Sequence, residues 1–247
     1  MRDSQFDVEA VFDVTDYLYF YGPALTPERT EREIDLIWRL LDIRPGMTVL
    51  DLACGHGRIA NGLAKRGCQV TGLDVTPAFL EQARQDAAAS GVKVEYIEGD
   101  MRVLPWTVHF DCIINWFTAY GYFPDDDNRK VLSEACRALK VGGKLLLDLN
   151  NRERILKNYQ HVATVERDGN YMLDRMRYDV LTGRNYTERI ILRDGQVRQM
   201  HFFVRFFTYP ELATWLQQAG FWQIHGYDQD GQALNLESYR MIVVADK

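Results

Sequence analysis

The sequence predicts an α/β fold in which an inserted antiparallel sheet interrupts an open sheet of mostly parallel strands. Between Pro45 and Asn150, short apolar runs alternate with stretches of helical period, a pattern typical of βαβ units. From about Val162 to Phe207 the pattern changes to strand-like alternation, interrupted by Asp-Gly and Thr-Gly pairs that indicate hairpin turns. The remaining residues have the pattern of one helix and two strands, which would complete the first sheet.

The expected elements follow one another in a regular order. Aromatic residues are frequent from Phe6 to Tyr21, and Thr26 with Pro27 starts a helix that should end before Pro45. The next elements are expected to be strand 48–52, helix 58–66, strand 69–73, helix 76–90, strands 93–97 and 110–115, helix 125–139 and strand 144–150. The insertion should hold four strands, and helix 210–220 with strands 221–227 and 240–245 should close the chain.

Length and composition narrow the classes of protein to which the chain can belong. Of its 247 residues, 47% are hydrophobic and 26% charged, which indicates a globular protein with a substantial core. The net charge is −6, so we expect neither nucleic acid nor a membrane as a partner. No apolar run has the length of a membrane span, and residues 1–9 lack the apolar stretch of a secretory signal, so a cytoplasmic location is expected.

Cysteine and histidine usage points away from disulfides and metals. The four cysteines are dispersed in or beside apolar segments, which favours reduced thiols in the core. The five histidines are scattered without the spacing of metal ligands, so we expect no bound metal.

The most informative segment runs from Val49 to Arg58, where a buried strand enters a glycine-bearing turn that opens a helix. Gly55 and Gly57 allow a ligand to approach the backbone at the carboxyl edge of the sheet, and the helix N-terminus offers free N–H groups. Asp74 ends the second strand, where its carboxylate is placed to accept hydrogen bonds from two ribose hydroxyls. The pattern therefore predicts a nucleotide-type pocket.

A dinucleotide is one candidate ligand of this pocket, because Gly55, Gly57 and Ala60 also match the dinucleotide fingerprint G-x-G-x-x-[GA]. An oxidoreductase that uses NAD or NADP is therefore one candidate. Asp51 argues against it, since a carboxylate at the strand end just before the turn would lie beside a pyrophosphate. The same carboxylate is well placed for a cationic amine.

The segment Asp51-Leu52-Ala53-Cys54-Gly55-His56-Gly57 resembles the first glycine motif of the class I S-adenosylmethionine-dependent methyltransferases. Other elements of that family follow in its order, namely Gly99-Asp100-Met101, Asn115-Trp116-Phe117 and Gly142-Gly143-Lys144. The resemblance covers roughly residues 45–247 and implies a Rossmann-like sheet with an antiparallel last strand. It also implies methyl transfer from S-adenosyl-L-methionine, with S-adenosyl-L-homocysteine as product. Ala53 stands where the family usually has its first glycine, a change that the turn should tolerate.

For the adenosine end of the cofactor, the resemblance implies four contacts. Asp74 would hold the ribose, and Val75 would pack on the adenine. Asp100 would accept a hydrogen bond from the adenine amino group, with the backbone N–H of Met101 beside it.

For the methionyl end, the resemblance implies that Gly55 and Gly57 pass close to the chain and that Asn115 lines the sulfonium region. Arg58, the first residue of the helix, could meet the methionyl carboxylate or be solvated. The complete set of expected cofactor-binding residues is Asp51, Ala53, Gly55, Gly57, Arg58, Asp74, Val75, Asp100, Met101 and Asn115.

Residues 16–21, the aromatic run 116–123 and the insertion also resemble small-molecule methyltransferases of natural-product pathways, including N-methyltransferases of lincosamide antibiotics and amino sugars. This resemblance implies an N-terminal helical lid (1–44), a cofactor-binding core (45–150 and 208–247) and an inserted sheet (151–207). The insert would roof the substrate pocket or join two subunits. The expected partner is a small-molecule acceptor, together with a second copy of the chain if the insert joins subunits.

Methyl transfer is an in-line displacement, so it needs residues that align the acceptor and exclude water. His201 and His56 are the candidate bases, but we expect His201 to be a packed sheet residue and His56 to face solvent. The shortage of an obvious base favours an amine nitrogen as acceptor, with oxygen and carbon acceptors open. An NAD(P)-dependent oxidoreductase and a noncatalytic binding protein are the alternatives of other classes. The aromatic residues expected to position the reactants are Tyr17, Tyr21, Phe117 and Tyr120.

Overall fold

The structure is a computed structural model that describes residues 11–247. Residues 1–10 lie outside the described part. They include Phe6, where the predicted aromatic segment starts, and residues 1–9, which were predicted to hold no secretory signal. Across residues 11–247, no helix is both long enough and apolar enough to cross a membrane.

The strands of the main sheet run in the order β10-β11-β5-β4-β1-β2-β3. Strands β1 to β5 pair in parallel, whereas β11 is antiparallel to both of its neighbours, β5 and β10. The predicted fold class, with its antiparallel last strand and its insertion after the fifth strand, is therefore confirmed. The strands of this sheet are β1 (Thr48–Leu52), β2 (Gln69–Asp74), β3 (Val94–Glu98), β4 (Phe110–Asn115), β5 (Leu139–Asn150), β10 (Gln223–Tyr227) and β11 (Arg240–Asp246).

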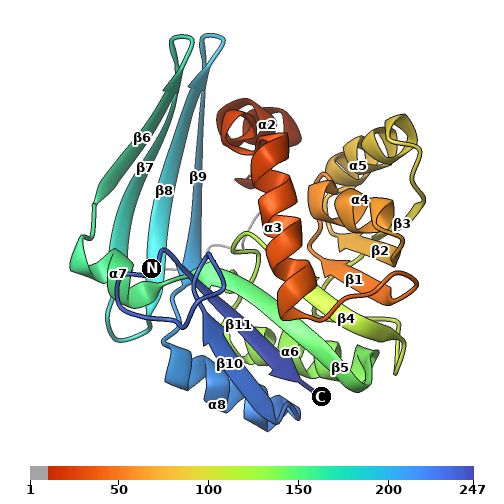
Figure 1. Cartoon of the computed structure of the whole chain (residues 1–247). Helices are drawn as coiled ribbons and strands as arrows, with labels where there is room; N and C mark the ends of the chain where they lie inside the picture. Colours follow the sequence, from red (N-terminus) through yellow and green to blue (C-terminus); the bar gives the residue numbers. More distant parts are fainter. Residues whose placement is uncertain (1–10) are drawn as a thin grey trace.

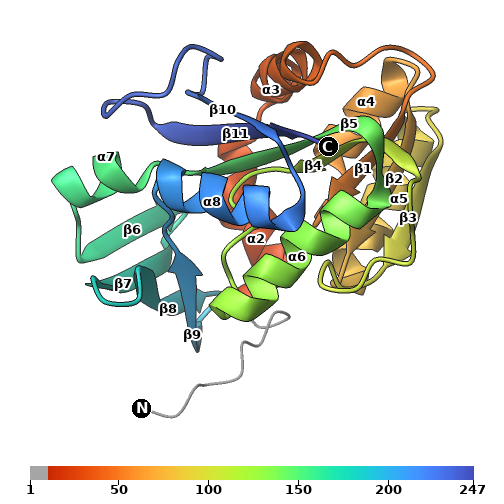
Figure 2. The ribbon, with the colours of Figure 1, turned by 90° about the horizontal axis from the view of Figure 1, so that it is seen from below.

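Helices cover both faces of this sheet, as Figures 1 and 2 show. One hydrophobic cluster joins the sheet to α6 and α8, and a second joins its other face to α3, α4 and α5. Each side chain layer is buried because alternate residues of the central strands face opposite sides. The described helices are α2 (Val14–Tyr21), η1 (Gly22–Ala24), α3 (Pro27–Leu40), α4 (Arg58–Lys65), α5 (Pro77–Ala89), α6 (Asp125–Ala138), α7 (Arg152–Lys157) and α8 (Tyr209–Ala219).

The insertion forms a separate antiparallel sheet in the order β6-β7-β8-β9. Its strands are β6 (Val162–Arg167), β7 (Asn170–Asp179), β8 (Arg184–Arg193) and β9 (Gln196–Arg205), so the turns fall at the predicted Asp-Gly and Thr-Gly pairs. The short helix α7 before β6 is an element that the sequence pattern did not predict. Figure 1 shows this sheet standing beside the α/β part, with α2 lying between them.

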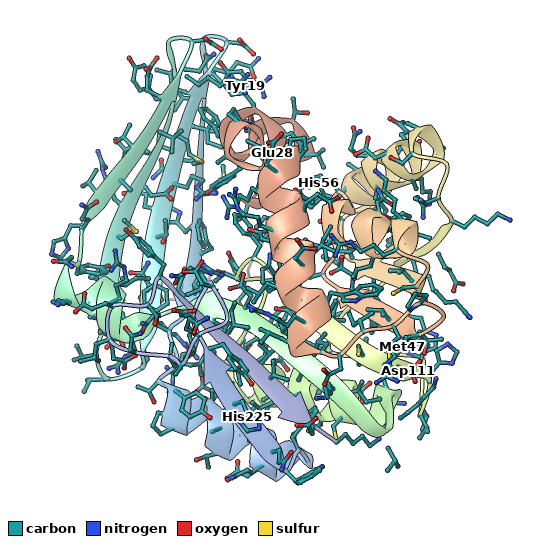
Figure 3. The ribbon with its side chains drawn as sticks, viewed as in Figure 1. Tyr19, Glu28, Met47, His56, Asp111 and His225 are labelled. Carbon is teal, nitrogen blue, oxygen red and sulfur yellow. The ribbon has the colours of Figure 1, made fainter. Side chains whose placement is uncertain are left out.

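Helix α2 is attached to the inserted sheet by charge and by aromatic contacts. Asp16, which is 4% exposed, forms ion pairs with Arg193 and Arg198 of β8 and β9. The Tyr19 hydroxyl donates a hydrogen bond of 2.9 Å to the Arg167 carbonyl at the end of β6, and Figure 3 shows Tyr19 near the tips of these strands. Helix α2 and the inserted sheet, which are far apart in the sequence, therefore form one continuous wall.

Candidate active site

A cavity of about 780 Å³ lies between the carboxyl edge of the main sheet and the inserted sheet. The β1–α4 turn, the end of β2 and the loop after β4 line one side of it. Helix α2 lines it with tyrosines, and strands β7, β8 and β9 line the opposite side. The position agrees with the rule that open α/β sheets bind ligands where the strand order reverses, which here is between β1 and β4.

The β1–α4 turn is shaped by left-handed backbone conformations. Ala53, Gly55 and Gly57 have φ angles of 63°, 54° and 77°. The backbone N–H of Gly55 donates a hydrogen bond of 2.8 Å to one carboxylate oxygen of Asp74, and the N–H of Thr76 donates one of 2.9 Å to the other. The turn and the end of β2 are thereby held together, and the Asp74 carboxylate lines the cavity, where it can also accept from a ligand hydroxyl.

Asp51 and Arg58 place opposite charges on the wall of this part of the cavity. Asp51 is only 2% exposed, and burial raises the pKa of its carboxyl to about 7, against the opposing influence of Arg58. Arg58 forms an ion pair with Glu33 of α3, and Glu33 also accepts a hydrogen bond of 3.0 Å from the Trp116 indole. The Nη2 atom of Arg58 is buried and has no hydrogen-bond partner among the described residues.

Aromatic side chains close the cavity from the side of α2. The rings of Tyr17 and Tyr21 lie 5.0 Å apart, and Tyr17 also makes an edge contact of 5.2 Å with Phe79. Burial raises the pKa of Tyr17 to about 12 and also raises that of Tyr21, so both phenols are neutral at pH 7. Phe117 lines the cavity as well, with the guanidinium groups of Arg29 and Arg58 above its ring at 5.3 and 5.6 Å.

His56 was expected to face solvent, and the structure corrects this expectation. Its ring lies in the cavity wall, 6.2 Å from the ring of Tyr17, and Figure 3 shows it beside α3 at the carboxyl end of the sheet. Burial and the nearby Arg58 lower the pKa of His56 to about 4, so the imidazole is neutral at pH 7. Asp111, by contrast, lies at the amino end of the sheet, where Thr48 and Lys140 bind its carboxylate.

The structure does not bring all of the expected residues to the cavity. Tyr120 is fully buried in the core, where its hydroxyl donates to the Asn128 carbonyl and its ring stacks on Phe207 at 5.3 Å. His201 is exposed, because it lies on the face of β9 opposite to the cavity-lining Phe202. Tyr120 is therefore corrected from a positioning role to a core position, and His201 from a possible base to an exposed position on β9.

Three of the expected cofactor contacts also lie off the cavity wall. Asn115 is buried, and its Nδ2 donates a hydrogen bond of 2.9 Å to the Leu52 carbonyl at the end of β1. Gly57 lies against the Tyr96 side chain, so it shapes the turn without lining the cavity. The Asp100 carboxylate is bound by Arg102 at 2.6 Å, and its contact with adenine stays a prediction. The expected residues that do line the cavity are Tyr17, Tyr21, Phe117, Asp51, Ala53, Gly55, Arg58, Asp74, Val75 and Met101.

Several cavity residues were missed by the sequence analysis. Asp174 and Arg189 form an ion pair of 2.7 Å on the inserted sheet, and both line the cavity. Their pairing had a signal, because a hairpin turn at residues 182–183 sets 174 opposite 189 in register. Glu33 does not line the cavity but binds Arg58, and it had no comparable signal, since this contact depends on how α3 packs beside α4.

The observed side chains fit S-adenosylmethionine. The Asp74 oxygens can accept from ribose hydroxyls, and the unpartnered Nη2 of Arg58 is a donor for the methionyl carboxylate. Asp51 offers a buried carboxylate for the ammonium group. The fold and this site together define an S-adenosylmethionine-dependent methyltransferase.

Comparisons with known proteins agree with this class. Residues 49–143 match the family model described as "Methyltransferase domain". The chain is 30% identical over 208 residues to the glycine/sarcosine N-methyltransferase of Parasynechococcus marenigrum, covering 81% of this chain and 71% of that protein. The chain therefore belongs to the class I S-adenosylmethionine-dependent methyltransferases, and it is an enzyme of that type.

Two solved structures resemble the whole fold at low sequence identity. An S-adenosylmethionine-dependent methyltransferase from Clostridium acetobutylicum superposes with a TM-score of 0.78, at 16% identity, over 96% of this chain and 98% of that one. A sugar N-methyltransferase from Streptoalloteichus sp. superposes with a TM-score of 0.72, at 20% identity, over 100% of this chain and 98% of that one. These similarities support the fold over nearly the whole length of the chain, including the inserted sheet.

Proposed function

We propose that the protein methylates an amine nitrogen of a small molecule held between the glycine turn and the inserted sheet. The observation that carries this proposal is the set of carboxylates that the described residues place on the cavity wall, because these are the groups that could act as a base. Its carboxylates are Asp51, Asp74 and Asp174, and the last is bound by Arg189. An amine that arrives unprotonated needs no strong base, whereas an alcohol does.

The ionisable groups near α2 support this choice of nucleophile. His56, with a pKa of about 4, is too weak a base to remove a proton from an alcohol at neutral pH. Tyr17, with a pKa of about 12, remains a neutral phenol. Both groups can form hydrogen bonds that orient an amine, but neither can generate an alkoxide.

The residues of this chain contribute alignment and exclusion of water. S-adenosylmethionine supplies an activated methyl group on a sulfonium. The lone pair of the acceptor nitrogen forms the new N–C bond, the S–C bond breaks with its electron pair left on sulfur, and the surplus proton leaves to water. Holding both reactants in line is worth up to about 7–11 kcal/mol in well-oriented cases. Tyr17, Tyr21 and Phe117 enclose the region where the reactants would meet.

The test is a comparison of matched acceptors with the purified protein and S-adenosylmethionine. We expect formation of S-adenosylhomocysteine with cyclohexylamine and none with cyclohexanol. Tyr17→Phe should lower turnover while leaving the affinity for S-adenosylhomocysteine unchanged. Methylation of alcohols or phenols in preference to amines would contradict the proposal and favour an O-methyltransferase.

A further inference from the structure

The inserted sheet presents a buried ion pair to the cavity, opposite the glycine turn. Arg189 of β8 donates to both carboxylate oxygens of Asp174 on β7, through Nε and Nη2, each at 2.7 Å. The side chains are only 9% and 17% exposed, and the guanidinium lies 5.2 Å from the ring centroid of Phe202. The pair is therefore fixed in orientation by two strands and an aromatic ring.

This ion pair acts directly on a tyrosine of α2. The Nη2 atom of Arg189 also donates a hydrogen bond of 2.9 Å to the Tyr21 hydroxyl. That bond uses a lone pair of the Tyr21 oxygen and draws electron density toward the guanidinium, so the hydroxyl becomes a better donor and a poorer acceptor. Among the described residues, no group accepts the Tyr21 O–H proton, and the side chain lines the cavity.

The neighbouring tyrosine differs from Tyr21 in its hydrogen bonding. Tyr17 lies 5.0 Å away, ring to ring, and its hydroxyl has no hydrogen-bond partner in the part of the chain that the structure describes. No guanidinium donates to it, so both of its lone pairs remain able to accept. The cavity thus places the polarised O–H donor of Tyr21 next to the Tyr17 hydroxyl, which can accept a hydrogen bond.

We propose that the acceptor is an amine with an oxygen atom on the carbon next to the one that bears the nitrogen, as in a β-amino alcohol or an amino acid. Its oxygen accepts a hydrogen bond from Tyr21, and its N–H donates to Tyr17. The reverse arrangement would direct the polarised O–H of Tyr21 at the nitrogen and occupy the lone pair that must attack the methyl group. Arg189 and Asp174 are then positioning residues, and the inference rests on the proposed amine acceptor.

The test compares two probes that differ by one hydroxyl, trans-2-aminocyclohexanol and cyclohexylamine. Binding of each probe to the complex with S-adenosylhomocysteine is measured by titration calorimetry, and turnover is measured separately with S-adenosylmethionine. We expect the wild type to bind the amino alcohol about tenfold more tightly, since one good hydrogen bond has about that value. In Tyr21→Phe the ratio should fall to near one, whereas Tyr17→Phe should weaken both probes.

Arg189→Gln tests the positioning role, because it leaves the Tyr21 hydroxyl in place but removes the charge. The preference for the amino alcohol should fall severalfold in this variant, and the affinity of each variant for S-adenosylhomocysteine shows that the fold is intact. Equal binding of the two probes to the wild type, or a preference that survives Tyr21→Phe, would overturn the inference. Discrimination in binding without turnover of any amine would instead overturn the proposed amine methylation.

Discussion

The backbone N–H of Gly55 donates a hydrogen bond to the Asp74 carboxylate at 2.8 Å, which joins the glycine turn to the end of β2. Asp74→Asn keeps the shape of the side chain but removes the charge that strengthens hydrogen bonds to ribose hydroxyls. Affinity for S-adenosylhomocysteine should fall by about 1–3 kcal/mol, measured by calorimetry, with a urea unfolding curve as the control for stability. Unchanged affinity would remove Asp74 from the ribose.

Arg58 is expected to bind the carboxylate of the methionyl group. Arg58→Met should weaken S-adenosylhomocysteine by about 2 kcal/mol, because it removes a charge-assisted hydrogen bond at a buried site. Methylthioadenosine lacks the carboxylate and serves as the matched ligand, so its affinity should change little. Equal losses for both ligands would show that the substitution disturbs the turn through the lost ion pair with Glu33.

Cofactor affinity should depend on pH through Asp51, whose pKa is about 7. If the ionised carboxylate holds the ammonium group, affinity for S-adenosylhomocysteine rises from pH 6 to pH 8 by up to about tenfold. The pH dependence of folding stability has the opposite sign to that of cofactor affinity. Because burial raises the pKa of Asp51 above its unfolded value, the contribution of Asp51 to the free energy of unfolding is fully present below pH 4 and is lost as pH rises through 7. Asp51→Asn should flatten the binding profile, and a steep profile in that variant would assign the effect to another group.

We expect Gly57 to contribute to stability as well as to the shape of the turn. A methyl group at this position would lie 2.2 Å from the Tyr96 hydroxyl, and the φ angle of 77° disfavours any side chain. Tyr96 is held in place by a hydrogen bond of 2.8 Å to Asn61. Gly57→Ala should therefore lower the free energy of unfolding by about 2–4 kcal/mol in urea titrations.

Gly55→Ala is the matched control for Gly57→Ala. Its φ of 54° imposes a similar backbone strain, but nothing lies within 4 Å of the added methyl group. Its unfolding free energy should fall by only about 1–2 kcal/mol. If both variants lose the same stability, the contact between Gly57 and Tyr96 has no energetic importance.

The inserted sheet offers an edge for association between two copies of the chain. Strand β6 forms one edge of this sheet, and Val162 and Val165 on it are 52% and 38% exposed. Exposed apolar edge strands favour pairing with another chain. Sedimentation analysis should show a dimer that Val165→Lys weakens, with Val141→Lys, at an exposed position on β5, as the control. A monomeric wild type would leave the sheet with a role in the cavity alone.

The order of the elements was readable from the sequence because each one had local signals. The strand at 110–115 was predicted with its observed bounds, and most other boundaries agree to within a residue or two, since apolar periodicity and cap residues fix them locally. The strand expected at 144–150 instead begins at Leu139. The structure extends the strand through Gly142 and Gly143, which precede the expected start.

The parts of the site that the sequence missed depend on packing between distant segments. In β9 both faces are partly apolar, so periodicity could not decide whether His201 or Phe202 faces the cavity. In the loop after β4, Tyr120 turns into the core and Tyr122 lines the cavity, although both are tyrosines in the same aromatic run. Such choices are made by tertiary contacts, and a single sequence carries no local record of them.

The attachment of α2 to the inserted sheet has a consequence for engineering the enzyme. Asp16 is buried against Arg193 and Arg198, so we expect that residues 14–21 and 162–205 have to be exchanged together. A chimera that receives the insertion of a relative without its N-terminal helix would bring together unmatched charges in a buried joint. Grafting a new acceptor preference onto this chain should therefore succeed only when both segments are transplanted together.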